Sequence, residues 1–508
     1  MKNKSIKKWA IAVFSIFTMI GIVSCVGIKN QIKQHTGGKT EIVDASLFNP
    51  ITSPIAIINV NVLSPDCSEM IDSTTVLIKD GLIESVAKNV TIPEGFVEVD
   101  GRGQFLLPGF IDTHMHLQRS KNDLLLYLAN GVTSVAELFG QERHLNWREA
   151  AKNGALSPNI FVSTRKLGSQ KGLMPKIRSW FGARANYTTL KQAQKAVKAY
   201  KQKGYDAIKL SSFLNSEIYK ALVDEAQKQD IQAIGHVSSN VGLERFYTSG
   251  QSQLAHVEEV VKNLQKCFGG VNSKNAEEFL KYVEEQADSI SVKIRDNNIV
   301  VSSTLWLMES IPRQMFQCEQ FVKEIPLEYA NPGQVEGSKK AKGWLPDNNH
   351  YENVEVLKDP EWKRLSEIYW NTYVKAIHIV TKSMIKNKVI LLAGTDANTA
   401  GTVPGFSLHD EFVSLNNVGM SNAQVLRSTT SDAAKWMKMN TGNIEKGYQA
   451  DLVLLSKNPL EDISNTQSIE SVITNGKLLN RKELDKMLQA VKEANNSSRK
   501  VSIDEFLD

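Results

Sequence analysis

Short apolar segments rich in β-forming residues alternate with helical patterns along most of this 508-residue chain. Helical periodicity fills several of the intervals, for example residues 190–203 and 217–229. The candidate strands lie near Phe110, Ser134, Ile160, Ala207, Ala233, Leu254, Val300 and Leu391. Eight alternations of strand and helix predict an α/β fold, a parallel (β/α)8 barrel of the TIM type, over residues 109–440.

The two ends of the chain predict a second, smaller domain. Between residues 55 and 107, short β-rich pieces are separated by turn signals such as Lys79-Asp-Gly81, as in an antiparallel sheet. Residues 450–455 and 471–476 have the same character. We therefore expect residues 51–108 and 441–480 to form one small β-sandwich.

Four further segments lie outside the eight candidate strands and the two β-rich ends of the chain. Residues 308–388 are too long for a simple connection, and they contain four prolines followed by a helical pattern over 362–386, so we expect an insertion that forms a partly helical lid over the barrel mouth. Amphipathic segments at 408–417 and 422–438 would complete the outer layer of the barrel. The polar tail, 481–508, predicts a surface helix with a frayed end.

The first 25 residues have the character of a targeting signal. Lysines precede an apolar stretch that is short for a bilayer span, and Ile22-Val-Ser-Cys25 resembles the lipobox of bacterial lipoproteins. This predicts a signal peptide at 1–24, a lipidated Cys25 and a flexible linker over 25–50. The protein would then be exported and anchored by lipid to a bacterial membrane, on the periplasmic or cell-surface side. A plain signal peptide or a short anchor is the alternative.

Charge and cysteine content exclude several functions. The formal net charge is +5, but four lysines lie within the first eight residues, so a basic nucleic-acid-binding surface is not predicted. The three cysteines after Cys25 are widely spaced, so they suggest neither a disulfide framework nor a cysteine nucleophile. The partners that we expect are a small molecule and, through the lipid, a membrane. A homo-oligomer is compatible with the sequence.

Five of the apolar runs end in residues that can bind a metal, six residues in all. These residues are His114, His116, Lys209, His236, His256 and Asp396. Rigid strands with open ends suit a hydrolytic metal centre, and side chains two apart on a strand, such as His114 and His116, point the same way. Taken singly, each histidine is more often a buried structural residue, and Asp396 can equally cap the next helix.

The surrounding sequence connects these residues to a known family. Leu107-Pro-Gly-Phe-Ile-Asp-Thr-His-Met-His-Leu117 resembles the first-strand signature of the amidohydrolase superfamily. Segments 57–112, 206–236, 393–397 and 447–454 look like its imidazolonepropionase-like branch, which includes metal-dependent dipeptidases of the prolidase type. The resemblance covers residues 52–480, apart from 308–388.

The resemblance implies a ligand set for two divalent metal ions. His114, His116 and Asp396 would bind one ion, His236 and His256 the second, and Lys209 would bridge both as a carbamate formed with carbon dioxide. An unmodified ammonium group would repel two cations. A lysine that extends from the strand end to solvent, or one that pairs with a phosphate, is the alternative. Zinc is the first expectation, and manganese or iron would tolerate the same ligands.

This centre predicts hydrolysis of an amide or related carbon–nitrogen bond. Two metals that share a water lower its pKa, and Asp396 would carry the proton to the leaving amine. His236-Val-Ser-Ser239 lacks the glutamate that mononuclear deaminases of the family carry at the last position, which disfavours deamination. A dipeptidase or carboxypeptidase is the expected type. Hydrolysis of cyclic amides, lactones or phosphoesters is an alternative, as is a non-catalytic binding lipoprotein on a degenerate barrel.

Three other residues are candidates for contact with the substrate. His409, just after the eighth strand, either contacts the substrate or packs its helix. Arg165 and Lys166 follow the third strand and are able to meet a substrate carboxylate, although a solvated basic loop is the more common outcome. The family's histidine-bearing, glycine-rich segment is replaced here by residues 167–172, which contain no histidine.

Overall fold

The computed structural model describes residues 26–507 except 53, 181, 183 and 340. The expected signal peptide, 1–24, and the expected lipid site, Cys25, lie outside the described residues. None of the described helices combines the length and the apolar character that crossing a bilayer requires.

A parallel barrel forms the centre of the molecule, as predicted. Its strands are β6 (Phe110–Met115), β7 (Val132–Glu137), β8 (Asn159–Val162), β11 (Ala207–Leu210), β12 (Gln232–Gly235), β13 (Gln253–Leu254), β14 (Val300–Ser302) and β15 (Leu391–Leu392). Neighbouring strands run parallel, and single bridges close the ring between Ser163 and Ala207 and between Met115 and Ala397. All eight strand positions expected from the sequence are occupied.

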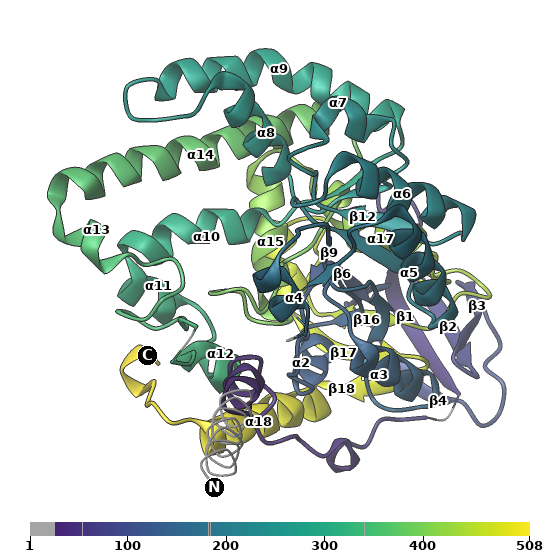
Figure 1. The fold of residues 1–508 in the computed structure, drawn as a ribbon. Helices are drawn as coiled ribbons and strands as arrows, with labels where there is room; N and C mark the ends of the chain where they lie inside the picture. Colours follow the sequence, from purple (N-terminus) through teal and green to yellow (C-terminus); the bar gives the residue numbers. More distant parts are fainter. Residues whose placement is uncertain (1–25, 53, 181, 183, 340, 508) are drawn as a thin grey trace, which may run out of the picture.

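Helices surround these strands (Figure 1). They are α2 (Asp123–Ala129), α3 (Glu142–Lys152), α4 (Leu173–Trp180), α5 (Leu190–Gln202), α6 (Ser216–Lys228), α7 (Gly242–Tyr247), α8 (Glu258–Phe268), α9 (Ala276–Asp296), α15 (Phe406–Asn417), α16 (Asn422–Ser428) and α17 (Ser431–Met437). Side-chain caps start several of them; Thr189 accepts from Gln192 N at the start of α5, for example. The apolar face of α5 then buries Ala193 and Val197 against the barrel.

One segment that was expected to form a single helix forms two. The pattern over 422–438 predicted a single helix, but α16 ends before Thr429 and α17 begins at Ser431. The Thr429 hydroxyl accepts a hydrogen bond from Ile111 N and donates one to Ile111 O, and Thr429 O also accepts from Ile111 N. These bonds to β6 hold Thr429 out of a continuous helix, a tertiary effect that periodicity does not record.

The two chain ends build one further sheet. Its strands are β1 (Ile55–Leu63), β2 (Met70–Lys79), β3 (Leu82–Ala87), β4 (Val97–Asp100), β5 (Phe105–Pro108), β16 (Leu452–Leu455), β17 (Ile469–Thr474) and β18 (Lys477–Asn480). They lie in one continuous sheet, and Ile57, Leu106 and Leu454 share a core cluster. The sheet is mixed, not antiparallel as expected, because β1 pairs in parallel with both β4 and β5.

The insertion is largely helical and reaches the barrel mouth. It comprises α10 (Leu305–Phe316), α11 (Cys318–Glu324), a 3-10 turn (Leu327–Tyr329), α12 (Pro332–Glu336), α13 (Val354–Lys358) and α14 (Pro360–Lys386). Helix α14 packs along α9 (Figure 1). Phe321 and Trp344 share a core cluster with Ala400 and Val403, which belong to the loop that follows β15.

The expected flexible linker over 25–50 is instead folded onto the barrel from residue 26 onward. Residues 26–35 form a helix, and residues 36–43 run across the loop after β6. Arg119 N donates to Thr36 O, and Val43 N donates to the Asn122 side chain. We call residues 26–50 the N-terminal segment. Its polar composition suggested a segment exposed to solvent, but polar groups of the segment form hydrogen bonds to the barrel instead.

The C-terminal tail is also packed more tightly than expected. Helix α18 (Arg481–Ser498) buries Leu484, Met487 and Val491, and it packs against α2. After the helix, the Arg499 guanidinium donates to backbone carbonyls of the insertion, and Phe506 joins the insertion's core. These contacts hold the described end of the tail, which we had expected to be frayed.

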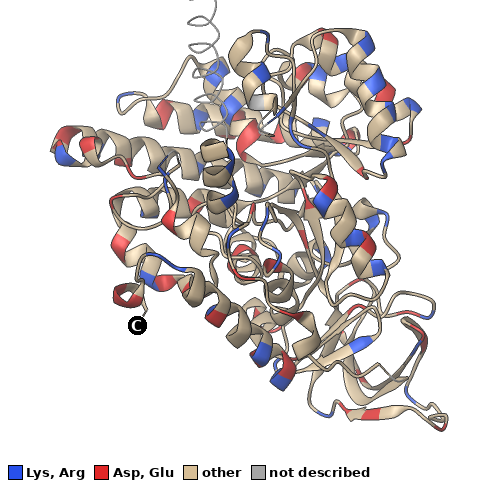
Figure 2. Ribbon diagram, turned by 60° about the horizontal axis from the view of Figure 1, so that its bottom comes forward, with Lys and Arg blue, Asp and Glu red and all other residues tan. Residues whose placement is uncertain are grey.

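Charged side chains of both signs are interspersed along the outer helices (Figure 2). Most of the exposed ion pairs join residues close in sequence, such as Lys220 and Asp224 on α6, and pairs of this kind contribute little stability.

Asn331 is predicted to hold the N-terminal segment in place. Its side chain is 2% exposed, accepts from the Thr40 hydroxyl and donates to Gly37 O and Ser120 Oγ. Asn331→Ala should lower the free energy of unfolding by about 1–3 kcal/mol, because buried partners lose their hydrogen bonds. It should also accelerate proteolysis within residues 26–50. Urea unfolding and timed proteolysis measure both effects, with the exposed helix-end substitution Asn297→Ala as control. Unchanged proteolysis would contradict the assignment.

Candidate metal centre

The six predicted ligands converge at the carboxyl ends of the barrel strands. His116 Nε2 lies 2.7 Å from Asp396 Oδ1, and His114 Nε2 lies 3.3 Å from the same oxygen. Lys209 Nζ lies 3.0 Å from His114 Nε2. The ring of His256 stacks on that of His114 with centroids 4.5 Å apart, and the His236 ring lies 5.4 Å from His256. Residues separated by up to 282 positions thus meet at one point.

Close contact between the last barrel strand and the first brings Asp396 to the histidines. Asp396 N and Thr395 N both donate to His114 O, at 2.7 and 3.1 Å. Asp396 takes a left-handed φ of 54°, a conformation that non-glycine residues adopt at a cost and that is concentrated at functional sites. A Cβ on Gly394 would meet His114 Cβ at 2.8 Å, so only glycine permits this approach.

Hydrogen bonds on the outer ring nitrogens orient the imidazoles. His114 Nδ1 bonds to Ala255 O at 3.0 Å, and His256 Nδ1 to the Thr304 hydroxyl at 2.9 Å. His236 Nδ1 lies 3.1 Å from the Glu259 carboxylate. With Nδ1 occupied in this way, the Nε2 atoms are available to the centre, and such outer partners fix both the tautomer and the ring orientation of metal-binding histidines.

Two buried carboxylates beside the histidines, Glu137 and Glu259, were not predicted from the sequence. Glu137, at the end of β7, lies 3.6 Å from His116 Nδ1 and accepts from Phe139 N. Burial alone would raise the pKa of Glu137, but His144, His116 and the backbone donor lower it to about 2. Glu259 likewise has a lowered pKa despite burial, because His236 and Lys262 favour its charge. The one available signal was position: Glu137 ends an apolar strand, as the ligands do.

Asp112 holds together the two backbone segments that carry ligands of the centre. Its carboxylate accepts from His114 N at 3.1 Å and from Thr395 N at 3.2 Å, and the Thr395 hydroxyl donates to it at 2.6 Å. Asp112 therefore ties the strand that carries two histidines to the turn that carries Asp396. The sequence motif contained Asp112, but its spacing gave no indication of this role.

The protonation states favoured by the site suit metal binding. Burial lowers the pKa of Lys209 to about 7, with the neighbouring Lys166 charge adding to the shift. Burial lowers the pKa of His236 to about 4 and that of His256 well below its usual range. Burial opposes the ionisation of Asp396, but His114 and His116 hold its pKa well below the ordinary carboxyl value. Neutral His236 and His256 and an ionised carboxylate are ligands for a divalent cation; burial opposes protonation of His116, but the Asp396 carboxylate raises the pKa of that ring.

The geometry of the donors fits a metal ion. One ligand atom each of His114, His256 and Asp396 lie within 4.8 Å of one another. His236 Nε2 is buried and has no hydrogen-bond partner within the described part of the chain. Nitrogen and oxygen donors that converge in this way, with one buried donor unpaired, are expected where a cation completes the site.

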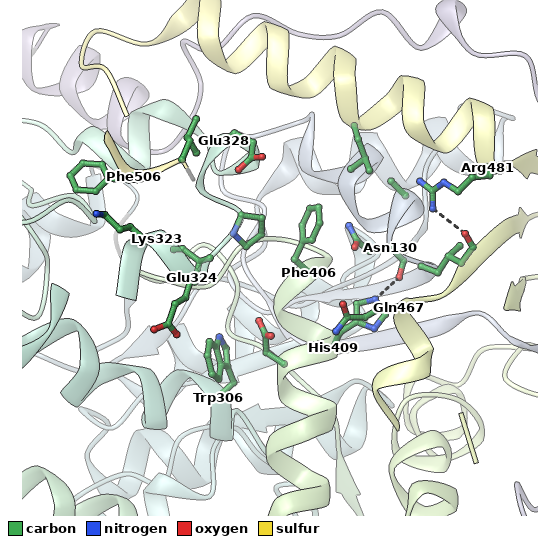
Figure 3. A pocket seen from close by; sticks show the side chains of 17 residues that line it. Asn130, Trp306, Lys323, Glu324, Glu328, Phe406, His409, Gln467, Arg481 and Phe506 are labelled. Atoms are coloured by element: carbon green, nitrogen blue, oxygen red, sulfur yellow. Dashed lines mark hydrogen bonds between the residues drawn. The ribbon is translucent and has the colours of Figure 1, made fainter. Parts of the chain in front are cut away.

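His409 lies away from this centre. Its Nδ1 bonds to the Thr466 hydroxyl at 2.9 Å and its Nε2 to Asn130 O at 3.2 Å, so both ring nitrogens are engaged. Figure 3 shows it at the wall of a different pocket, of about 680 Å³, together with Asn130, Gln467 and Phe406. None of the six predicted ligands lines that pocket. The geometry therefore favours the helix-packing role for His409.

Comparison with known families agrees with this geometry. Residues 349–479 match the model of the "Amidohydrolase family". Over these residues the chain is similar to the amidohydrolase family, in which divalent metal ions are general. The match and the relatives support a hydrolase that acts on carbon–nitrogen bonds.

Relatives and solved structures share most of the chain. A 5'-deoxyadenosine deaminase from Methanosphaera stadtmanae is 23% identical over 81% of this chain and 91% of its own length. The structure of a bottromycin amidohydrolase covers 91% of this chain and 96% of its own, with a TM-score of 0.66 and 19% identity. A prolidase complexed with N-methylphosphonate-L-proline covers 84% of this chain and 99% of its own, with a TM-score of 0.61 and 20% identity. At these identities the two structures establish the shared fold.

Glu259 is predicted to raise metal affinity through His236. Glu259→Gln should weaken metal binding about 10- to 100-fold, because the neutral amide polarises and orients the imidazole less well than the carboxylate. Competition with a chromophoric chelator measures the affinity. The adjacent Glu258→Gln is the matched control, since Glu258 bonds to Tyr373 and Lys262 and not to a histidine. Equal affinities for Glu259→Gln and the wild type would refute this role.

Proposed function

We propose that this amidohydrolase uses two divalent metal ions to cleave the amide bond of a dipeptide-like or N-acyl amino acid substrate. The observation that carries the proposal is the convergence of four imidazoles, one carboxylate and one buried lysine within a single centre. A structural cluster of histidines would not need a lysine among them, because its charge would have to be buried without compensation.

The assignment of ligands follows the family resemblance. His114, His116 and Asp396 would hold one ion, and His236 and His256 the other. Lys209, carboxylated by carbon dioxide, would bridge them, and its depressed pKa favours the neutral amine, which is the form that reacts. Zinc suits these nitrogen and oxygen donors best. When bound, such a pair of ions lowers the pKa of water and polarises a carbonyl.

Asp396 is the residue positioned to move the proton. Its carboxylate lies at the centre between His114 and His116, and its lowered pKa keeps it ionised and ready to accept a proton from the attacking water. The hydroxyl of that water adds to the substrate carbonyl carbon. As the carbon–nitrogen bond breaks, Asp396 returns the proton to the leaving nitrogen, which gives a free carboxylic acid and a free amine.

Two observations support a peptidase-like substrate over deamination. A solved structure of similar fold is a prolidase. Position 239, where mononuclear deaminases of the family carry a glutamate, is Ser239 here, and its backbone is hydrogen-bonded to Ser212 O. The deaminase relative is 23% identical and the prolidase 20% identical, so neither identity by itself assigns a substrate to this chain.

We also propose that the enzyme is exported and held at a bacterial membrane by lipid on Cys25. The lipobox-like sequence before Cys25 supports this location. The described N-terminal segment starts at the next residue and runs onto the barrel mouth, where Ile32, His35 and Thr36 line a cavity that His116 also lines. The anchor would then lie near the opening of the active site.

Metal analysis combined with Lys209→Ala tests the proposed centre. The purified wild type, reconstituted with zinc in bicarbonate, should contain about two ions per chain and should hydrolyse members of a dipeptide and N-acyl amino acid library. Lys209→Ala should lose the binuclear loading and at least roughly 10³-fold of the turnover. The exposed Lys171→Ala is the matched control. Wild-type protein that binds no metal would favour a binding lipoprotein, and full activity in Lys209→Ala would refute the bridging lysine.

A further inference from the structure

A cavity of about 490 Å³ opens beside the metal centre, and its charged lining is cationic. Its lining residues are Ile32, His35, Thr36, His116, Gln118, Arg119, Phe139, Gln141, Arg143, Lys166 and Gly182. Three of these are lysine or arginine, and none is an aspartate or a glutamate. The volume is in the range of small-molecule binding sites. Because His116 is one of the predicted metal ligands, the cavity leads directly to the reacting centre.

The three cations come from three different strand-end loops. Arg119 follows β6, Arg143 lies at the start of α3 after β7, and Lys166 follows β8. The backbone under Lys166 is fixed, since Lys166 O accepts from Ala185 N in the short parallel pairing of 167–168 with 185–186. All three side chains are half-buried. Segments that follow three different barrel strands therefore place positive charge around one cavity.

In the described part of the chain, no carboxylate forms an ion pair with Arg119, Arg143 or Lys166. Within the described residues, no hydrogen bond or ion pair joins the side chains of Lys166 or Arg119 to another group, and Arg143 donates only to a backbone carbonyl, Gln118 O. Burial lowers the pKa of Lys166, and the charges of Asp396 and Glu259 offset only part of that effect. Both carboxylates are engaged by imidazoles, Asp396 by His116 and Glu259 by His236. Half-buried cations without a partner carry a desolvation cost that an anionic ligand would offset.

We propose that this cavity binds the carboxylate of the substrate, with Lys166 as its main contact and Arg119 and Arg143 at the rim. The inference rests on the proposed function and assigns the residues that would recognise the free carboxylate of N-acyl amino acid and dipeptide substrates. Lys166 is the residue best placed, because it lies two residues after Thr164, whose hydroxyl accepts a hydrogen bond from the backbone N–H of Lys209 in the centre. A carboxylate held there keeps the neighbouring amide within reach of the centre.

The recognition is tested by binding, without turnover. Isothermal titration of the metal-free and the zinc-loaded protein uses a panel of N-acetyl-L-amino acids and their matched carboxamides, which differ only in the charge of the terminal group. The best-bound acids should bind at least about 10- to 100-fold more tightly than their amides, because a charge-assisted hydrogen bond contributes that much to affinity. Lys166→Met should remove this preference, and Lys166→Arg should retain part of it. Lys171→Met, an exposed lysine outside the cavity, should leave the preference unchanged.

Several results would overturn the inference. Equal binding of acids and amides by the wild type, or binding of neither, excludes a carboxylate site. A preference for acids that survives in Lys166→Met and requires zinc shows that the metal centre itself binds the carboxylate. Loss of zinc from Lys166→Met shows that Lys166 supports the centre and does not contact the substrate. Failure of the proposed function looks different, since the preference for acids would persist while no member of the library is hydrolysed.

Discussion

The contact between the first and the last barrel strand is the interaction on which the centre depends. His114 O receives two backbone hydrogen bonds from residues 395 and 396, and the Asp112 carboxylate joins the same two strands through Thr395. A barrel must close at this seam, so the contact is required by the fold before any chemistry is considered. The same closure places Asp396 against His114 and His116. The geometry of the site is therefore a consequence of the topology of the barrel.

Buried carboxylates fix the loops around this seam. Glu137 accepts from Leu117 N and Phe139 N, Glu259 from Val237 N, and Glu411 from Leu305 N and Trp306 N. Each of these N–H groups lies just after a barrel strand, where the ladder of the sheet ends and the backbone donors lose their regular partners. A carboxyl group there satisfies those donors. Burial still raises the pKa of Glu411 to about 8, whereas Glu137 and Glu259 stay ionised because neighbouring histidines favour their charge. Glu137 and Glu259 also face a histidine, so the groups that hold the loops also orient the ligands.

The sequence predicted the parts of this structure that depend on local pattern. The eight strands, α5, α6 and α14 were visible in hydrophobic periodicity, and the ligands were visible because each ends an apolar run. The missed parts depend on contacts between distant segments. The break between α16 and α17 arises from hydrogen bonds to β6. Glu137 differs from an ordinary strand-end residue only in its contacts with His116 and His144. The left-handed conformation of Asp396 is imposed by the seam, and no local signal near Gly394 indicates it.

The packing of the N-terminal segment and the tail likewise depends on contacts between distant segments, which the sequence pattern did not predict. Part of this packing forms the wall of the cavity beside the centre. The segment and the tail are both polar in sequence; the first was expected to be flexible and the second to be a surface helix with a frayed end. Asn331 of the insertion nevertheless bonds to Gly37, and Glu41 N bonds to Ser498 at the end of α18. Three pieces outside the barrel thus hold one another at its mouth. Because Ile32 and His35 line the cavity that also contains Lys166, the space available to a substrate is defined partly by residues far from the barrel in sequence. The ligands of the centre are fixed by barrel closure, whereas the cavity wall combines strand-end residues such as His116 and Lys166 with residues of the N-terminal segment. The cavity beside the centre is therefore completed by a part of the chain that takes no part in barrel closure and meets it only in the folded state.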